Sequence, residues 1–225
     1  MNTSCEVIGN EIVFVLSDVD PAYHQAVRDL GYSEANDVLR RTLPAVTPDL
    51  DRVCRNFERY AEAMVLQTAR VQPVPWEQAL RAFLDLVEPF EINWWLAGSA
   101  ALAVRGLDIQ SRDFDINVDD AGTQMLGIVL QDYLVEPVTN VDWFCRWWGR
   151  AFLQPRFEWV GGVDERADDP LVSDFGPTAA SRLEQVTWHG TLLRVSPLRL
   201  QLEVSKRRGL ADRVAKIERV LEGRG

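Results

Sequence analysis

Two neighbouring stretches decide the fold: residues 94–106 read WWLAGSAALAVRG, and residues 111–118 read SRDFDINV. The second stretch alternates polar and apolar side chains, which predicts a strand with its apolar residues buried on one face. Asp113 and Asp115 then emerge side by side on the other face. Two carboxylates this close repel each other and raise one another's pKa, so the pair predicts a bound cation. Oxygen ligands without a neighbouring His or Cys favour Mg²⁺ or Mn²⁺.

The first stretch predicts a phosphate-binding turn ahead of this metal pair. Residues 92–97 are typical of a buried strand, and residues 100–104 of a helix, so Gly98 and Ser99 lie where strand turns into helix. Glycine lets the backbone approach a ligand closely. The serine hydroxyl and the free N–H groups of a helix start can both bind an anion.

A third carboxylate, Glu158, lies in the stretch RFEWV of residues 156–160. It alternates with two aromatic residues, so it can point to the polar face of a neighbouring strand. Three carboxylates can hold two metal ions for in-line phosphoryl transfer. A tryptophan-rich insertion, residues 141–149, precedes this strand, and Asp164 is the alternative if the strand is shifted.

Together these features resemble the pattern of the nucleotidyltransferase superfamily, to which DNA polymerase beta belongs. That pattern is a hydrophobic residue before Gly-Gly or Gly-Ser, a helix, Asp-x-Asp or Asp-x-Glu on a strand, and a third acid between hydrophobic residues. Residues 92–118 match it, and the likeness is closest to small bacterial nucleotidyltransferase-like proteins. Residues 197–206 resemble the last helix of that group, in which a lysine is common. The resemblance covers residues 76–222 and leaves out the first 70.

The resemblance implies a role for each matching residue. Gly98 and Ser99 would bind the triphosphate of a nucleotide, with Arg112 and Lys206 as phosphate partners. The metal ligands and catalytic residues would be Asp113, Asp115 and Glu158. The activity implied is transfer of a nucleoside monophosphate from a nucleoside triphosphate to a hydroxyl, with release of pyrophosphate. The acceptor would be a small molecule, a protein or an RNA end. The alternative is a non-catalytic nucleotide-binding or partner-binding module on the same fold.

The expected fold class is α+β, of the α/β type, with a small mixed β-sheet flanked by helices. The proline-rich stretch of residues 71–75 predicts a boundary between an N-terminal, mainly helical region (1–72) and the nucleotidyltransferase-like domain (73–225). Within the first region, residues 49–69 predict an amphipathic helix and residues 11–17 a strand. The remaining expected elements are helices at 76–86, 121–133 and 197–221, the last interrupted at Gly209, and strands at 112–118 and 152–160.

Composition narrows the class of partner. The 225 residues carry a net charge of −10, which makes general nucleic-acid binding unlikely to be the function. Nine of the basic residues lie from Arg194 onward, beside four acidic ones, so the tail could meet a nucleotide triphosphate. Three scattered cysteines argue against a disulfide framework and favour a cytoplasmic protein. No apolar stretch is long enough to span a bilayer.

The tryptophan-rich insertion supports two interpretations. Trp143, Phe144, Trp147 and Trp148 form an aromatic cluster that is typical of core packing or a lid. The same cluster could form a stacking wall for a nucleobase or a flat acceptor. The two histidines have no metal-ligand spacing, and Ser99 has no histidine partner for a hydrolase triad.

Overall fold

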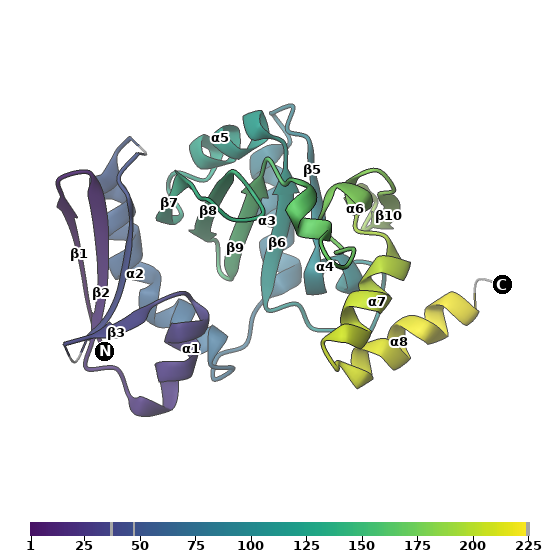
Figure 1. Ribbon diagram of the computed structural model, residues 1–225, viewed down its shortest axis with the longest axis horizontal. Coiled ribbons are helices and arrows are strands. Elements are labelled where there is room, and N and C mark those ends of the chain that lie inside the picture. The colour runs from purple at the N-terminus through teal and green to yellow at the C-terminus, as the bar shows by residue number, and fades with distance from the viewer. Residues whose placement is uncertain (37, 47, 224–225) are drawn as a thin grey trace.

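The computed structural model describes residues 1–36, 38–46 and 48–223 and contains two β-sheets that share one core. Figure 1 shows the N-terminal sheet at one end, the larger sheet in the middle and the C-terminal helices at the other end. The first sheet is antiparallel in the order β1-β2-β4-β3, with the bounds Asn2–Ile8, Glu11–Ser17, Val38–Pro44 and Ser33–Ala35. Two short helical turns, η1 (Pro21–Tyr23) and α1 (His24–Asp29), connect β2 to β3.

The prediction of a mainly helical N-terminal region is therefore wrong, although the strand at residues 11–17 and the long helix are confirmed. The edge strand β1 is largely exposed and lacks a strong apolar alternation, so its sequence carries little strand signal. It forms because seven of its residues pair in register with β2. Helix α2 (Leu50–Thr68) buries one face, including Phe57 and Met64, against this sheet and against β7.

The larger sheet is mixed and has seven strands in the order β10-β11-β5-β6-β9-β8-β7. In that order the strands span Glu184–Trp188, Thr191–Val195, Trp94–Ala97, Asp113–Val118, Arg156–Gly161, Trp147–Phe152 and Leu134–Asn140. The central pairs are β5 with β6, which are antiparallel, and β6 with β9, which are parallel. The mixed sheet with flanking helices confirms the α+β class.

Helices surround this sheet. They are α3 (Trp76–Val87), α4 (Gly98–Ala103), α5 (Asp120–Val129), η2 (Glu165–Asp168), α6 (Pro177–Ala180), α7 (Leu198–Arg207) and α8 (Ala211–Glu222). Helices α7 and α8 meet at Gly209, which has a φ of +66°, and this confirms the predicted interruption. The predicted strand at 152–160 begins too early, because β8 ends at Phe152 and β9 starts four residues later.

Buried polar contacts join the N-terminal elements to the larger sheet. From α2, the Asn56 amide donates to the Leu134 carbonyl at 3.0 Å, and the Gln67 amide donates to the Gln154 carbonyl at 2.7 Å. The hydrophobic core is also continuous across residues 71–75, since Phe57 and Phe157 belong to one cluster. The division of the chain into regions 1–72 and 73–225 stays a prediction.

One covalent contact also corrects the sequence analysis. Cys5 of β1 and Cys54 of α2 form a disulfide, with their Cα atoms 5.2 Å apart, whereas the scattered cysteines were expected to be unpaired. Residues 49 positions apart in sequence meet only because α2 packs on the first sheet. Cys145 is free and buried.

Candidate active site

The candidate site lies where β6 runs between β5 and β9. Phe114, Ile116 and Val118 are buried, as the alternation predicts. On the opposite face, Asp115 lies across from Glu158 in the parallel β6–β9 register. The sheet therefore brings Asp115 and Glu158 together and leaves Asp164, the alternative third carboxylate, outside the cavity lining. Asp164 caps η2 and binds Arg166 at 2.8 Å.

Gly98 lies directly against Asp115. Ala97 at the end of β5 is the register partner of Asp115, and Gly98 follows with a φ of +58°. A Cβ atom at Gly98 would lie 2.0 Å from Oδ2 of Asp115. Glycine is thus required here both by its backbone conformation and by the close approach of the carboxylate.

Gly98→Ala is expected to displace the Asp115 carboxylate and to destabilise the protein by about 1–3 kcal/mol, because it combines a left-handed backbone with a steric overlap. Urea unfolding would measure the loss. Gly190→Ala is the control, since Gly190 also has a positive φ but no atom within 4 Å of its would-be Cβ. An equal loss in both variants would show that only the backbone conformation matters at Gly98.

Ser99 supports the site rather than lining it. Its hydroxyl lies 3.2 Å from that of Ser111, which donates to the backbone carbonyl of Asp113 at 2.6 Å. These contacts link the start of α4 to the start of β6. The cavity lining does not include Ser99.

The carboxylates differ in their charge environment. Burial, together with the neighbouring charges of Asp113 and Glu158, raises the pKa of Asp115 to about 8. Asp113 forms an ion pair with Arg156. Although burial acts in the opposite direction, Arg150 and Arg156 hold the pKa of Glu158 below its usual range. Asp115 is thus the carboxylate that most needs an added cation.

A row of alternating charges continues from Glu158 across the sheet. Arg150 of β8 lies opposite Glu158 and donates to it through Nε at 2.6 Å. Arg150 also pairs with the buried Glu136 of β7, which Arg41 of β4 contacts at 2.9 Å. The guanidinium of Arg150 further donates to the Leu30 carbonyl at 2.9 Å. The N-terminal sheet is therefore connected through buried ion pairs to the third carboxylate of the site.

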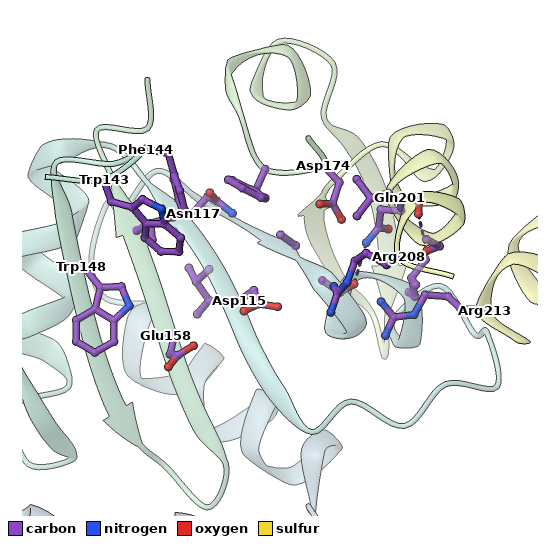
Figure 2. Close-up of a pocket in the computed structure, with 18 residues that line it drawn as sticks. Asp115, Asn117, Trp143, Phe144, Trp148, Glu158, Asp174, Gln201, Arg208 and Arg213 are labelled. Carbon is purple, nitrogen blue, oxygen red and sulfur yellow. Dashed lines mark hydrogen bonds between the residues drawn. The ribbon is translucent and has the colours of Figure 1, made fainter. Parts of the chain in front are cut away.

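A cavity of about 350 Å³ is lined by Gly98, Asp115 and Glu158, among other residues. Figure 2 shows Asp115 and Glu158 between an aromatic end, with Trp143, Phe144 and Trp148, and a polar end, with Asp174, Gln201, Arg208 and Arg213. The guanidinium groups of Arg208 and Arg213 form no hydrogen bond or ion pair within the described residues. Burial and the neighbouring Arg208 lower the pKa of Arg213. The polar end thus presents two guanidinium groups to an anionic ligand, although the buried carboxyl of Asp174 lies near enough to interact electrostatically with both of them.

Lys206 and Arg112, the phosphate partners implied by the family resemblance, lie outside the cavity lining. Nζ of Lys206 instead binds Glu218 at 3.1 Å and Glu203 at 3.9 Å, and Arg112 is exposed. Sequence reasoning missed Arg208 and Arg213, although the local basic cluster was an available signal. Which of these basic residues faces the cavity depends on how α7 turns into α8.

The donor set fits one divalent cation. Among residues 1–36, 38–46 and 48–223, no three His, Cys, Asp or Glu side chains are arranged to hold a metal ion. Mg²⁺ is commonly bound by one or two carboxylates together with substrate phosphates and water. Asp113 and Asp115 lie on the same face of β6 and could meet that lower requirement, but Asp113 pairs with Arg156 and lies outside the cavity lining. Burial, and then the charges of Asp113 and Glu158, raise the pKa of Asp115.

Within the described part of the chain, every helix is too short or too polar to cross a membrane. No protein-family model matches the chain, and no curated protein matches it in sequence. Among solved structures, a candidate nucleotidyltransferase from Thermotoga maritima is similar with a TM-score of 0.49 and 18% identity, over 66% of this chain and 93% of its own. The lincosamide antibiotic adenylyltransferase LnuA, in its lincomycin-bound form, is similar with a TM-score of 0.47 and 16% identity, over 65% of this chain and 98% of its own. At these identities the likeness is one of backbone shape alone.

Proposed function

We propose that the protein is a metal-dependent nucleotidyltransferase that moves a nucleoside monophosphate from a nucleoside triphosphate to a hydroxyl of an acceptor. The observation that carries this proposal is the position of Asp115, which lies between Gly98 and Glu158 in one cavity. Two arginines at one end of the same cavity suit a polyanionic leaving group. A phosphate grip beside a carboxylate pair is what phosphoryl transfer requires.

Each group has a proposed part in the reaction. Asp113 and Asp115 would hold Mg²⁺, which when bound supplies positive charge against the negative charge that develops on the phosphoryl group. Glu158, which lines the same cavity, would accept the proton of the acceptor hydroxyl as the hydroxyl oxygen bonds to the α-phosphorus. The bond from that phosphorus to pyrophosphate breaks, and pyrophosphate leaves toward Arg208 and Arg213. The lack of a side chain at Gly98 leaves space for the Asp115 carboxylate itself.

The experiment is to incubate the protein with Mg²⁺, a nucleoside triphosphate labelled at the α-phosphate and a cell extract. We expect Mg²⁺-dependent release of pyrophosphate and transfer of label to an acceptor. The molecule that becomes labelled would identify the acceptor as a small molecule, a protein or an RNA. Release of pyrophosphate without Mg²⁺, or none under any condition, would contradict the proposal.

One observation favours the alternative of a non-catalytic nucleotide-binding module. Arg156 pairs with Asp113, and Arg150 pairs with Glu158, so two of the three carboxylates already have cationic partners. Such pairs could replace metal ions and leave binding without chemistry. Tight binding of a triphosphate with no pyrophosphate release would support this module over the enzyme.

Substitutions in α7 and α8 test directly whether the polar end of the cavity binds the phosphates. Arg213→Met is expected to lower affinity for MgATP by about tenfold or more, because a charge-assisted hydrogen bond is worth roughly 1.5–3 kcal/mol. Lys206→Met is the matched control and should change affinity less than threefold, since Lys206 lies outside the cavity and pairs with Glu218. Isothermal titration calorimetry would measure the affinity of both variants for MgATP. A loss in Lys206→Met alone would move the phosphate contact to that residue.

A further inference from the structure

Besides Trp148 of β8, three rings from two separate loops line the aromatic end of the cavity. Trp143 and Phe144, between β7 and β8, have ring centroids 3.7 Å apart, and Phe144 lies 4.9 Å from Phe175, which follows η2. All three residues line the cavity, and Trp143 is 61% exposed. A large aromatic side chain left this exposed beside a cavity is an available stacking surface.

The loop that carries these rings is held in place. Arg166 binds Asp142 at 3.2 Å and Asp164 at 2.8 Å, which fixes both sides of the loop. The backbone N–H of Asp164 donates to the Phe144 carbonyl at 3.0 Å. These contacts link the loop of Trp143 and Phe144 to the segment that follows β9.

Asn117 provides an independent sign of a ligand at this end. It follows Asp115 by two residues on β6, so its side chain lies on the same face, and it lines the cavity. The residue is only 1% exposed, yet its Oδ1 atom has no hydrogen-bond partner within the described residues. A buried amide oxygen without a partner is unfavourable, so this atom points to a donor supplied by a ligand. Figure 2 shows Asn117 beside Trp143 and Phe144.

We propose that the aromatic end binds the nucleobase of the triphosphate, and that Asn117 Oδ1 accepts a hydrogen bond from its exocyclic amino group. This inference rests on the proposed function and specifies a base with an exocyclic amino group, for which ATP is the test ligand. A nucleoside triphosphate has a polyanionic end and a flat apolar end, and the cavity presents arginines, carboxylates and aromatic rings in the matching order. Adenine presents an amino group that an asparagine side chain can pair with.

The test compares three ligands with the purified full chain in Mg²⁺, by isothermal titration without any acceptor. They are ATP, inosine triphosphate, which has an oxygen in place of the amino group, and inorganic tripolyphosphate, which has no base. Wild-type protein is expected to bind ATP about threefold to tenfold more tightly than inosine triphosphate, as one neutral hydrogen bond provides. Asn117→Leu should abolish that preference and leave the affinity for tripolyphosphate unchanged.

Trp143→Ala should lower affinity for both nucleotides at least fivefold, as expected for a lost stacking contact, and should leave tripolyphosphate binding unchanged. Trp147→Ala is the matched control, because Trp147 does not line the cavity, and it should bind all three ligands like the wild type. The comparison of ATP with inosine triphosphate in the wild type needs no substitution, so it holds even if a variant does not fold.

The outcomes separate this inference from the proposed function. Equal affinity of the wild type for ATP and inosine triphosphate would overturn the hydrogen bond to Asn117. If tripolyphosphate also bound equally well, the nucleobase site would be overturned while phosphate binding stayed intact. Unchanged nucleotide affinity in Trp143→Ala would also overturn the nucleobase site. If none of the three ligands binds, the proposed function fails together with the inference.

Discussion

Asp115→Asn is expected to abolish nucleotidyl transfer, with a fall of roughly 100- to 1000-fold or more in the rate of pyrophosphate release. The substitution removes a proposed ligand of Mg²⁺ and thereby the charge that offsets the transition state. The shape of the site should hardly change, because asparagine fills nearly the same space beside Gly98. Asp108→Asn, at a fully exposed carboxylate, is the control and should retain full activity. Activity retained in Asp115→Asn would contradict metal catalysis at this site.

The same variant should be more stable than the wild type in the absence of Mg²⁺ and nucleotide. The pKa of Asp115 is about 8 in the folded protein, against ~3.9 in an unfolded chain. Between these values the folded state binds more protons than the unfolded state, so the stability of the wild type falls as the pH rises through this window. Asparagine cannot ionise, so the variant does not lose stability in this way as the pH rises.

Urea unfolding at pH 5 and pH 8 would measure the difference. We expect the variant's advantage to be small at pH 5 and to reach about 2–5 kcal/mol at pH 8, where the cost of ionising Asp115 is close to its full value. An advantage that stays constant with pH would show that ionisation of Asp115 is not its cause.

The second large effect is expected for Arg150→Met, which should lower the free energy of unfolding by about 3–5 kcal/mol. Arg150 is 4% exposed and is the shared partner of Glu136 and Glu158, and it also donates to Leu30. Removing it leaves the buried Glu136 and the partly buried Glu158 with fewer cationic partners. Such a loss costs far more than the loss of a surface ion pair.

Arg52→Met is the matched control, because Arg52 also binds two carboxylates, Asp49 and Asp132, but does so at the surface. It should cost less than about 1 kcal/mol. Adding Glu136→Gln to Arg150→Met should recover part of the stability, since it removes one of the buried charges. If Arg150→Met unfolds with the same urea dependence as Arg52→Met, the buried row of charges does not stabilise the fold.

The sequence by itself determined the elements whose residues are neighbours along the chain. Strict alternation at residues 112–118 placed Asp113 and Asp115 on one face, because a strand repeats every two residues. Helical spacing in the same way predicted α2, α3 and the pair α7 and α8. Gly98 was singled out because strand turns into helix there, and its positive φ agrees with that position.

Only the tertiary structure decided which distant residues meet. The N-terminal sheet was missed because β1 is an exposed edge strand, which forms through its register with β2 and not through a local pattern. The pairing of Cys5 with Cys54 depends in turn on α2 packing against that sheet.

In the cavity too, the sequence predicted some features and only the tertiary structure decided others. The family resemblance implied Lys206 as a phosphate partner, whereas the turn between α7 and α8 places Arg208 and Arg213 in the cavity lining. Asn117 was on the predicted polar face, but nothing in the sequence showed that its amide oxygen is buried without a partner. Local periodicity fixes the face of an element on which a side chain lies, while its partners depend on strand register and helix packing between segments far apart in the chain.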